Sequence, residues 1–182
     1  MIPAWDKSID LLARAELSSY DLIRKLKSRG YEQEEIEDTV TRLYEAGYLN
    51  DERYARAYIR RYSSDRSSGR ILQELRQKGI QPEDPQQLLQ EVYEEEERSE
   101  NQVLQKLIHS RLRYVPESVM LDMKNTKART DKKDMNGNVN GNVNGNSNGN
   151  KELNRLYSFL LRRGFSYGAV REAVDQYITE NA

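Results

Sequence analysis

The sequence predicts an all-α protein: an elongated tandem array of three three-helix repeats, with a disordered Asn/Gly-rich insertion in the third repeat. A glycine that follows Lys or Arg recurs at Gly30, Gly79 and Gly164. Leucine lies four residues before each glycine, and apolar or aromatic residues align ten and thirteen residues after it. Steps of three and four are the period of one buried helical face, and no stretch alternates long enough to indicate a strand.

The register divides the chain into repeats at residues 1–49, 50–98 and 99–182. In each repeat we expect one upstream helix, a second helix that ends at the shared glycine, and a third helix after it. Trp5, Ile9 and Leu12 mark the upstream helix of the first repeat. In the second repeat, Asn50 can cap the start of the upstream helix. In the third repeat, Ser99 and Gln102 have the spacing of a capping box at the start of the upstream helix.

The second repeat has the clearest pattern. Its upstream helix runs from Asp51 to about Tyr62, and Gly47 ends the helix before it. We assign Gly47, Gly79 and Asn50 to helix ends, and Asp84 followed by Pro85 to the start of the last helix of this repeat. The core of the repeat is predicted to include Tyr54, Tyr58, Leu72 and Leu75.

The third repeat carries about 36 additional residues, because Gly79 and Gly164 lie 85 residues apart whereas Gly30 and Gly79 lie 49 apart. We place a flexible insertion at about 114–150. Its centre, residues 136–150, is a string of Asn and Gly with two Val and one Ser, which offers almost no surface to bury. Flexibility of this whole segment is therefore expected.

Composition argues against catalysis. The chain has no cysteine and one histidine, His109, so thiol chemistry is excluded and transition-metal sites have few ligands available. It has neither a phosphate-binding loop nor a dinucleotide fingerprint. We expect a non-enzymatic protein with no cofactor, no metal and no membrane segment, in the cytoplasm.

Charge is segregated within the second repeat. Residues 51–80 contain eight Lys or Arg and four Asp or Glu, whereas residues 81–100 contain eight acids and one arginine. Arg53, Arg56 and Arg60 share one stripe of the helix, opposite the tyrosines, and such a stripe can follow phosphates or meet an acidic protein surface. The acidic run at 94–97 is expected to be a solvated face.

Residues 45–60, EAGYLNDERYARAYIR, and 69–80, GRILQELRQKGI, carry a family likeness. Both resemble signatures of the RecX family, in the expected order and at the expected separation. The resemblance implies curved arrays of three-helix units that bind the groove of the RecA filament on DNA. It also implies inhibition of the recombinase in DNA repair and recombination.

On this interpretation the partner is the RecA filament, DNA is contacted indirectly or weakly, and the chain is a monomer. The candidate contacts are the cationic residues of the second repeat: Arg53, Arg56, Arg60, Arg70, Arg76 and Lys78. Two alternatives remain open. One is a helical protein that binds DNA directly, and the other is a helical-repeat scaffold for a different protein.

Overall fold

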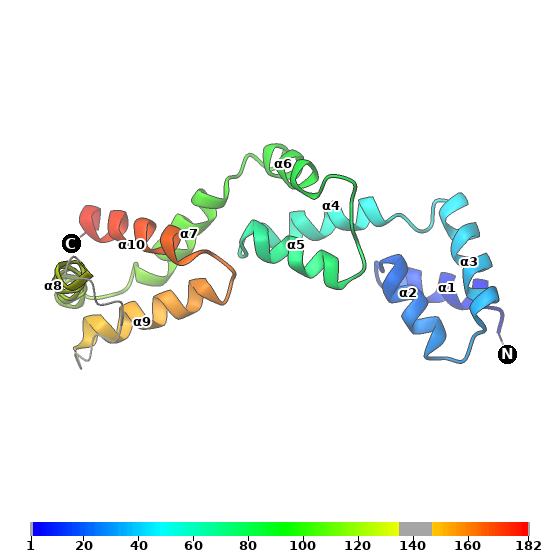
Figure 1. The fold of residues 1–182 in the computed structure, drawn as a ribbon, viewed down its shortest axis with the longest axis horizontal. Coiled ribbons are helices and arrows are strands. Elements are labelled where there is room, and N and C mark those ends of the chain that lie inside the picture. Colours follow the sequence, from blue (N-terminus) through cyan, green and yellow to red (C-terminus); the bar gives the residue numbers. More distant parts are fainter. Residues whose placement is uncertain (1, 135–146, 182) are drawn as a thin grey trace. The chain divides into compact units, whose positions relative to one another are not determined.

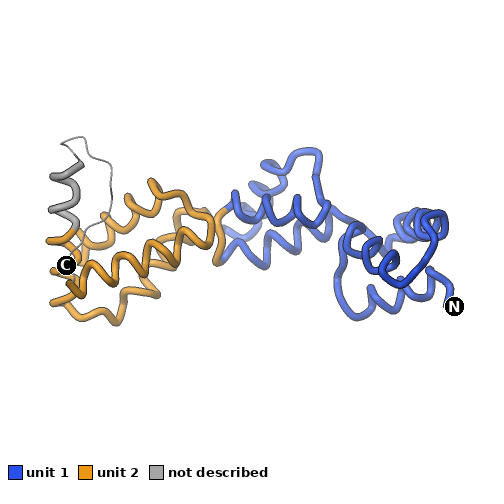
Figure 2. Tube along the Cα trace, turned by 60° about the horizontal axis from the view of Figure 1, so that its bottom comes forward, with its two compact units in different colours: residues 1–64, 68–97 blue, residues 65–67, 98–182 orange. Residues whose placement is uncertain are grey.

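The computed structural model describes residues 2–134 and 147–181, and it describes the side chains of all of these except 127–134. Within these residues all regular structure is α-helical, as predicted, and no helix is long and apolar enough to cross a membrane. The chain forms two compact units, residues 1–64 with 68–97 and residues 65–67 with 98–182 (Figure 2). The helices are α1 (Ala4–Arg14), α2 (Ser19–Lys27), α3 (Gln33–Glu45), α4 (Asp51–Tyr62), α5 (Ser68–Gln77), α6 (Pro85–Glu95), α7 (Glu100–Leu112), α8 (Glu117–Asp134), α9 (Asn148–Leu161) and α10 (Tyr167–Asn181) (Figure 1).

The first repeat comprises α1, α2 and α3. Ser18 starts α2, because its hydroxyl accepts a hydrogen bond from the backbone N–H of Asp21. Gly30, with φ of +83°, follows the end of α2 in the left-handed conformation that glycine adopts without strain. Apolar side chains from all three helices form the core, including the fully buried Leu22, Leu26, Ile36 and Leu43.

The second repeat comprises α4, α5 and α6. The predicted helix ends are confirmed: Gly47 and Gly79 have φ of +71° and +72°, and Asn50 accepts a hydrogen bond from the N–H of Arg53. Asp84 caps α6, with Pro85 in the first turn. The predicted core residues Leu72 and Leu75 are buried, whereas Tyr54 and Tyr58 are half-buried and pack against the edge of the cluster.

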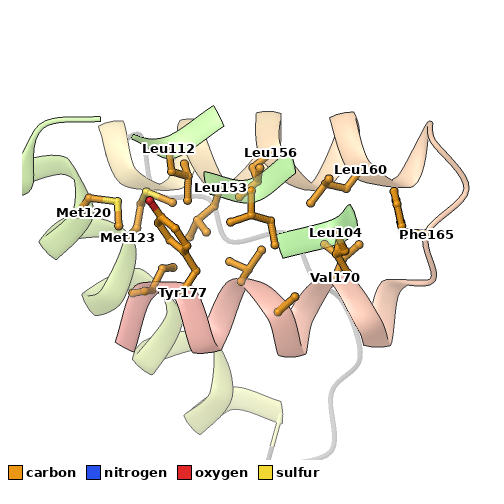
Figure 3. Close-up of a cluster of buried hydrophobic side chains, with 14 of the residues drawn as sticks. Leu104, Leu112, Met120, Met123, Leu153, Leu156, Leu160, Phe165, Val170 and Tyr177 are labelled. Atoms are coloured by element: carbon orange, nitrogen blue, oxygen red, sulfur yellow. The ribbon is translucent and has the colours of Figure 1, made fainter. Parts of the chain in front are cut away.

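The third repeat comprises α7, α8, α9 and α10. The predicted capping box at the start of α7 is present, with Ser99 and Gln102 exchanging hydrogen bonds between side chain and backbone. Leu104 of α7, Leu156 and Leu160 of α9, and Val170 of α10 belong to one buried core (Figure 3). The three predicted helices of the repeat correspond to α7, α9 and α10, and α8 is an additional helix within the predicted insertion.

The predicted flexible insertion was too wide at both ends. After residue 114 the chain enters α8, and the side chains of Met120 and Met123 are buried in the core of the repeat (Figure 3). At the other end α9 begins at Asn148, inside the Asn/Gly string. Residues 135–146, the middle of the predicted insertion, lie outside the described residues.

The start of α9 is fixed by contacts with α8 that composition does not reveal. Asp122 accepts a hydrogen bond from the backbone N–H of Gly149 at 2.7 Å, and Ser147 caps the N–H of Asn150. A Cβ on Gly149 would lie 2.5 Å from the backbone nitrogen of Met123, so only glycine permits this approach. Tertiary packing therefore overrides the poor helix propensity of Asn and Gly.

Candidate interaction surface

The helix α4 carries three of the six predicted contact residues. Ala55 and Ile59 are completely buried on one face of α4, which directs Arg53, Arg56 and Arg60 toward the opposite side. The predicted stripe therefore exists. Its surroundings, however, differ from those of a free basic surface.

Acidic residues of α6 pair with two of these arginines. The guanidinium of Arg56 contacts the carboxylates of Glu91 and Glu95, the second at 3.3 Å. The guanidinium of Arg60 contacts Glu95 at 2.8 Å and Glu96 at 2.9 Å. These five residues form a network that we call the α4–α6 clasp. The acidic run expected to be only solvated thus contributes two members, Glu95 and Glu96.

The clasp changes the electrostatics of this face. Glu52, one turn before Arg56, adds a further pair at 3.2 Å. Two arginines therefore face four carboxylates, and the excess charge is negative. The hydrogen bond from Gln87 and then the one from Arg56 hold the pKa of Glu91 below its usual value. Exposed pairs stabilise little individually, but a shared network fixes α6 beside α4.

The remaining predicted residues have varied environments. Arg53 is exposed, and its guanidinium donates a hydrogen bond to the carbonyl of Tyr48 at 3.4 Å. Arg70 pairs with Glu74 at 2.7 Å along α5. Arg76 is exposed and has no acidic partner among the described residues. Of the six, Arg53 and Arg76 are thus the two that are exposed and pair with no carboxylate among the described residues.

Lys78 belongs to a contact between the first and second repeats. Its ammonium lies 3.4 Å from the carboxylate of Asp21 on α2, and about equally far, 5.9 and 5.8 Å, from the ring centres of Tyr54 and Tyr58. Burial opposes its charge, but Tyr54 and Asp21 outweigh that effect and raise its pKa. Lys78 is therefore a structural cation inside this unit.

Asp51 is the centre of the same contact, which we call the repeat 1–2 joint. Its carboxylate accepts hydrogen bonds from the backbone N–H of Ser19 at 2.8 Å, from the Ser19 hydroxyl, and from the Tyr44 hydroxyl at 2.8 Å. Sequence reasoning placed Asp51 only in the first turn of α4. Nothing in the residue pattern indicated Ser19 or Tyr44, because their pairing depends on how the two repeats meet.

The joint is close-packed beside Gly79, the glycine that the second repeat shares in register with Gly30 and Gly164. Ser18 donates its hydroxyl to the carbonyl of Lys78 at 3.1 Å. A Cβ on Gly79 would lie 2.6 Å from the Cβ of Tyr20. Gly79 therefore serves two purposes, since it ends α5 and also admits the side chain of Tyr20 from the first repeat.

An open pocket of about 690 Å³ adjoins the clasp. Five carboxylates line it together with Arg56, so its chemistry is acidic: Asp51, Glu52, Glu83, Asp84 and Glu91. In the part of the chain that the structure describes, no group of three or more potential metal ligands is assembled. This face accordingly suits a basic partner group better than a phosphate.

Three segments of the chain match known domains. Residues 4–43, 50–89 and 143–174 match the first, second and third three-helix domains of RecX. The first range covers α1, α2 and nearly all of α3, and the second covers α4, α5 and the first part of α6. The third covers α9 and about half of α10. The order of the matches is the order of the repeats.

Individual relatives bear the same name. The regulatory protein RecX of Pseudomonas putida is 42% identical over 85 residues, 46% of this chain and 60% of that protein. That of Neisseria meningitidis serogroup A is 40% identical over 83 residues, 46% of this chain and 54% of that protein. The alignments thus span little more than half the length of these relatives.

Two solved structures share the fold. The crystal structure of RecX from Lactobacillus salivarius aligns with 95% of this chain and 93% of that one, at a TM-score of 0.54 and 16% identity. A crystal structure of a regulatory protein RecX aligns with 94% of this chain and 70% of that one, at a TM-score of 0.58 and 19% identity. With three RecX domains in sequence and the corresponding helical fold, the chain belongs to the RecX family of regulatory proteins.

Proposed function

We propose that this chain is a non-enzymatic regulator that binds the RecA filament on DNA and inhibits recombination by it. The observation that carries the proposal is the pair of adjacent RecX domain matches at residues 4–43 and 50–89. Both domains lie in one compact unit, and the repeat 1–2 joint fixes how they meet. The unit can therefore present two repeats together to neighbouring subunits of a polymer.

The physical basis of the proposed inhibition is multivalent attachment. Several weak contacts made by connected repeats combine through effective concentration, so a modest affinity per repeat suffices. Binding changes the filament only if it favours one state of the filament over another. A regulator that spans neighbouring subunits would oppose the rearrangement that ATP turnover and strand exchange require.

The structure refines which residues are proposed to contact the filament. Arg56 and Arg60 are engaged by the α4–α6 clasp, and Lys78 is engaged at the repeat 1–2 joint. Arg53 and Arg76 remain the strongest candidates, because each is exposed and neither forms an ion pair among the described residues. Their charges are available to an acidic partner surface.

The test measures ATP hydrolysis by RecA on single-stranded DNA as the chain is added, together with co-sedimentation with the filament. We expect inhibition and co-sedimentation. The double variant Arg53→Glu, Arg76→Glu should weaken both by about tenfold or more, because charge reversal at a contact adds repulsion to the lost attraction. The matched control is Lys27→Glu, since Lys27 lies three residues before Gly30 as Arg76 lies three before Gly79.

Unchanged hydrolysis with no co-sedimentation of the wild-type chain would refute the proposal itself. An equal loss in Lys27→Glu and in the double variant would retain the regulator and remove these two residues from its contact surface. A full helical circular dichroism spectrum of each variant excludes unfolding as the cause.

A further inference from the structure

The third repeat differs from the first two in charge. Residues 1–97 contain fifteen Lys or Arg and twenty-one Asp or Glu, a net charge of −6. Residues 98–182 contain fourteen Lys or Arg and nine Asp or Glu, a net charge of +5. The near-neutral total of the chain conceals this division, and the positive potential that attracts a polyanion belongs to the third repeat.

Arginines of the third repeat lie on aromatic rings. The guanidinium carbons of Arg111 and Arg163 lie 5.1 and 3.8 Å from the centre of the Phe159 ring. The guanidinium carbon of Arg113 lies 4.5 Å from the centre of the Tyr114 ring. Within the described residues these three arginines form no ion pair. They therefore contrast with Arg56, which three carboxylates engage.

This arrangement suits phosphate binding. A guanidinium that packs against a ring is held by its face, so the N–H donors at its edge stay available for hydrogen bonds to oxygen. Arginine also carries its charge at every physiological pH and matches the fork of phosphate oxygens. Arg111 and Arg113 are both exposed, in the last turn of α7 and at its C-cap. Because they are two residues apart, they lie on different sides of the helix end, and a single strand contacts both by passing around that end.

Tyr114 adds a surface for a base. Its side chain is 80% exposed, the most exposed large apolar side chain among the described residues. The negative end of the α7 dipole explains a cation at the helix terminus, but it does not explain an exposed aromatic ring beside it. Exposed aromatic rings interleaved with arginines are the chemistry by which proteins bind single strands without sequence preference.

We propose that the third repeat binds single-stranded nucleic acid directly, with Arg111 and Arg113 on the phosphates, Tyr114 stacked on a base, and the Phe159–Arg163 pair extending the surface. The site is separate from the residues proposed to contact the recombinase, which lie in the second repeat. Through this site the chain binds nucleic acid directly and not only through the recombinase.

The experiment measures the binding of the full chain to a fluorescent oligothymidylate of about 25 nucleotides, without recombinase, between roughly 50 and 200 mM salt. Arg111→Gln with Arg113→Gln should reduce the slope of log affinity against log salt by about 1.4, since each single-strand phosphate contact contributes about 0.7. Tyr114→Ala should lower affinity roughly 5- to 150-fold with the slope unchanged, as expected for one lost stacking contact.

The control variant is Lys151→Gln with Arg155→Gln. It removes the same formal charge from the same repeat, and Arg155 is already paired with Glu152 at 3.1 Å. We expect a smaller change in slope. Equal losses in the control and in the Arg111, Arg113 variant would overturn the site in favour of diffuse attraction. No measurable binding by the wild-type chain, or no effect of Tyr114→Ala, would also overturn it.

Further arms identify the preferred ligand. Oligouridylate replaces oligothymidylate to compare RNA with DNA, and binding of a duplex as tight as the single strand, regardless of Tyr114, would refute a single-strand site. Because the probe is bare oligonucleotide, its outcome is distinguishable from that of the filament assay. Loss of filament inhibition in Arg53→Glu, Arg76→Glu with normal oligonucleotide binding would separate the two surfaces.

Discussion

The close contact at Gly79 makes a sharp prediction about the repeat 1–2 joint. Alanine at Gly79 must adopt φ near +72°, and its Cβ would lie 2.6 Å from the Cβ of Tyr20. The left-handed conformation costs about 1–2 kcal/mol for a residue with a Cβ. The overlap adds about 1–3 kcal/mol, as for overpacking elsewhere, because the Cβ of Tyr20 is fixed to its helix and cannot rotate away. We expect a total loss of about 2–5 kcal/mol.

Gly47 provides a matched control. Its φ is +71°, and a Cβ there would meet nothing within 4 Å. Gly47→Ala should therefore lose only the backbone contribution of about 1–2 kcal/mol. The difference between the two variants isolates the steric contact across the joint.

The assay is urea denaturation followed by the fluorescence of Trp5. Trp5 is the single tryptophan and packs in the first repeat, with its ring centre 6.1 Å from that of Tyr48. The midpoint of Gly79→Ala should fall below that of Gly47→Ala by roughly 1 M, given the usual dependence of stability on urea for a domain of this size. Equal urea midpoints for Gly79→Ala and Gly47→Ala would refute the reasoning. They would show that the close approach of Gly79 to Tyr20 does not affect the stability of the first repeat.

Two further predictions concern α9 and the clasp. Gly149→Ala should destabilise the third repeat by about 1–3 kcal/mol or more, because its Cβ would lie 2.5 Å from the backbone nitrogen of Met123. Gly168→Ala, at the same second position of α10 with open space around it, should be neutral or stabilising by up to about 1 kcal/mol; thermal unfolding of both variants checks this, and similar melting temperatures would contradict it. The pKa of Glu91 is lowered in the folded chain, so its contribution is complete above the unfolded value near 4.5 and is lost as pH falls through the lower folded value. Melting temperatures from pH 7 to about pH 3 should therefore fall more steeply for the wild type than for Glu91→Gln, and parallel curves would show that the contacts of the Glu91 carboxylate with Gln87 and Arg56 do not stabilise the fold.

Helix positions were largely predictable from the sequence because their causes are local. Asn50 and Ser99 cap the helices that they precede, with Gln102 completing the capping box, and the glycines at the predicted helix ends have positive φ. Each of these features depends on a few consecutive residues. The steps of three and four between apolar residues then identified which helical face is buried.

The candidate surface was less predictable because it depends on contacts between distant residues. The stripe of Arg56 and Arg60 was correctly located, but the sequence did not show that α6 would bring Glu91 and Glu95 against it. The sequence separates a basic stretch from an acidic run that was expected to be only solvated, whereas folding brings the two together. Composition likewise failed at Gly149, where close packing on α8 requires a residue that is unfavourable in an isolated helix.

Asp51 has a consequence for the order in which a nascent chain acquires structure. It begins the second repeat, yet its carboxylate satisfies the hydroxyl of Tyr44 and the start of α2 at Ser19. The first repeat leaves the ribosome before Asp51 does, and still earlier than Gly79. Its helices can form at once, but the surface that carries Ser19 and Tyr20 stays exposed to water until the following repeat has been synthesised and has docked.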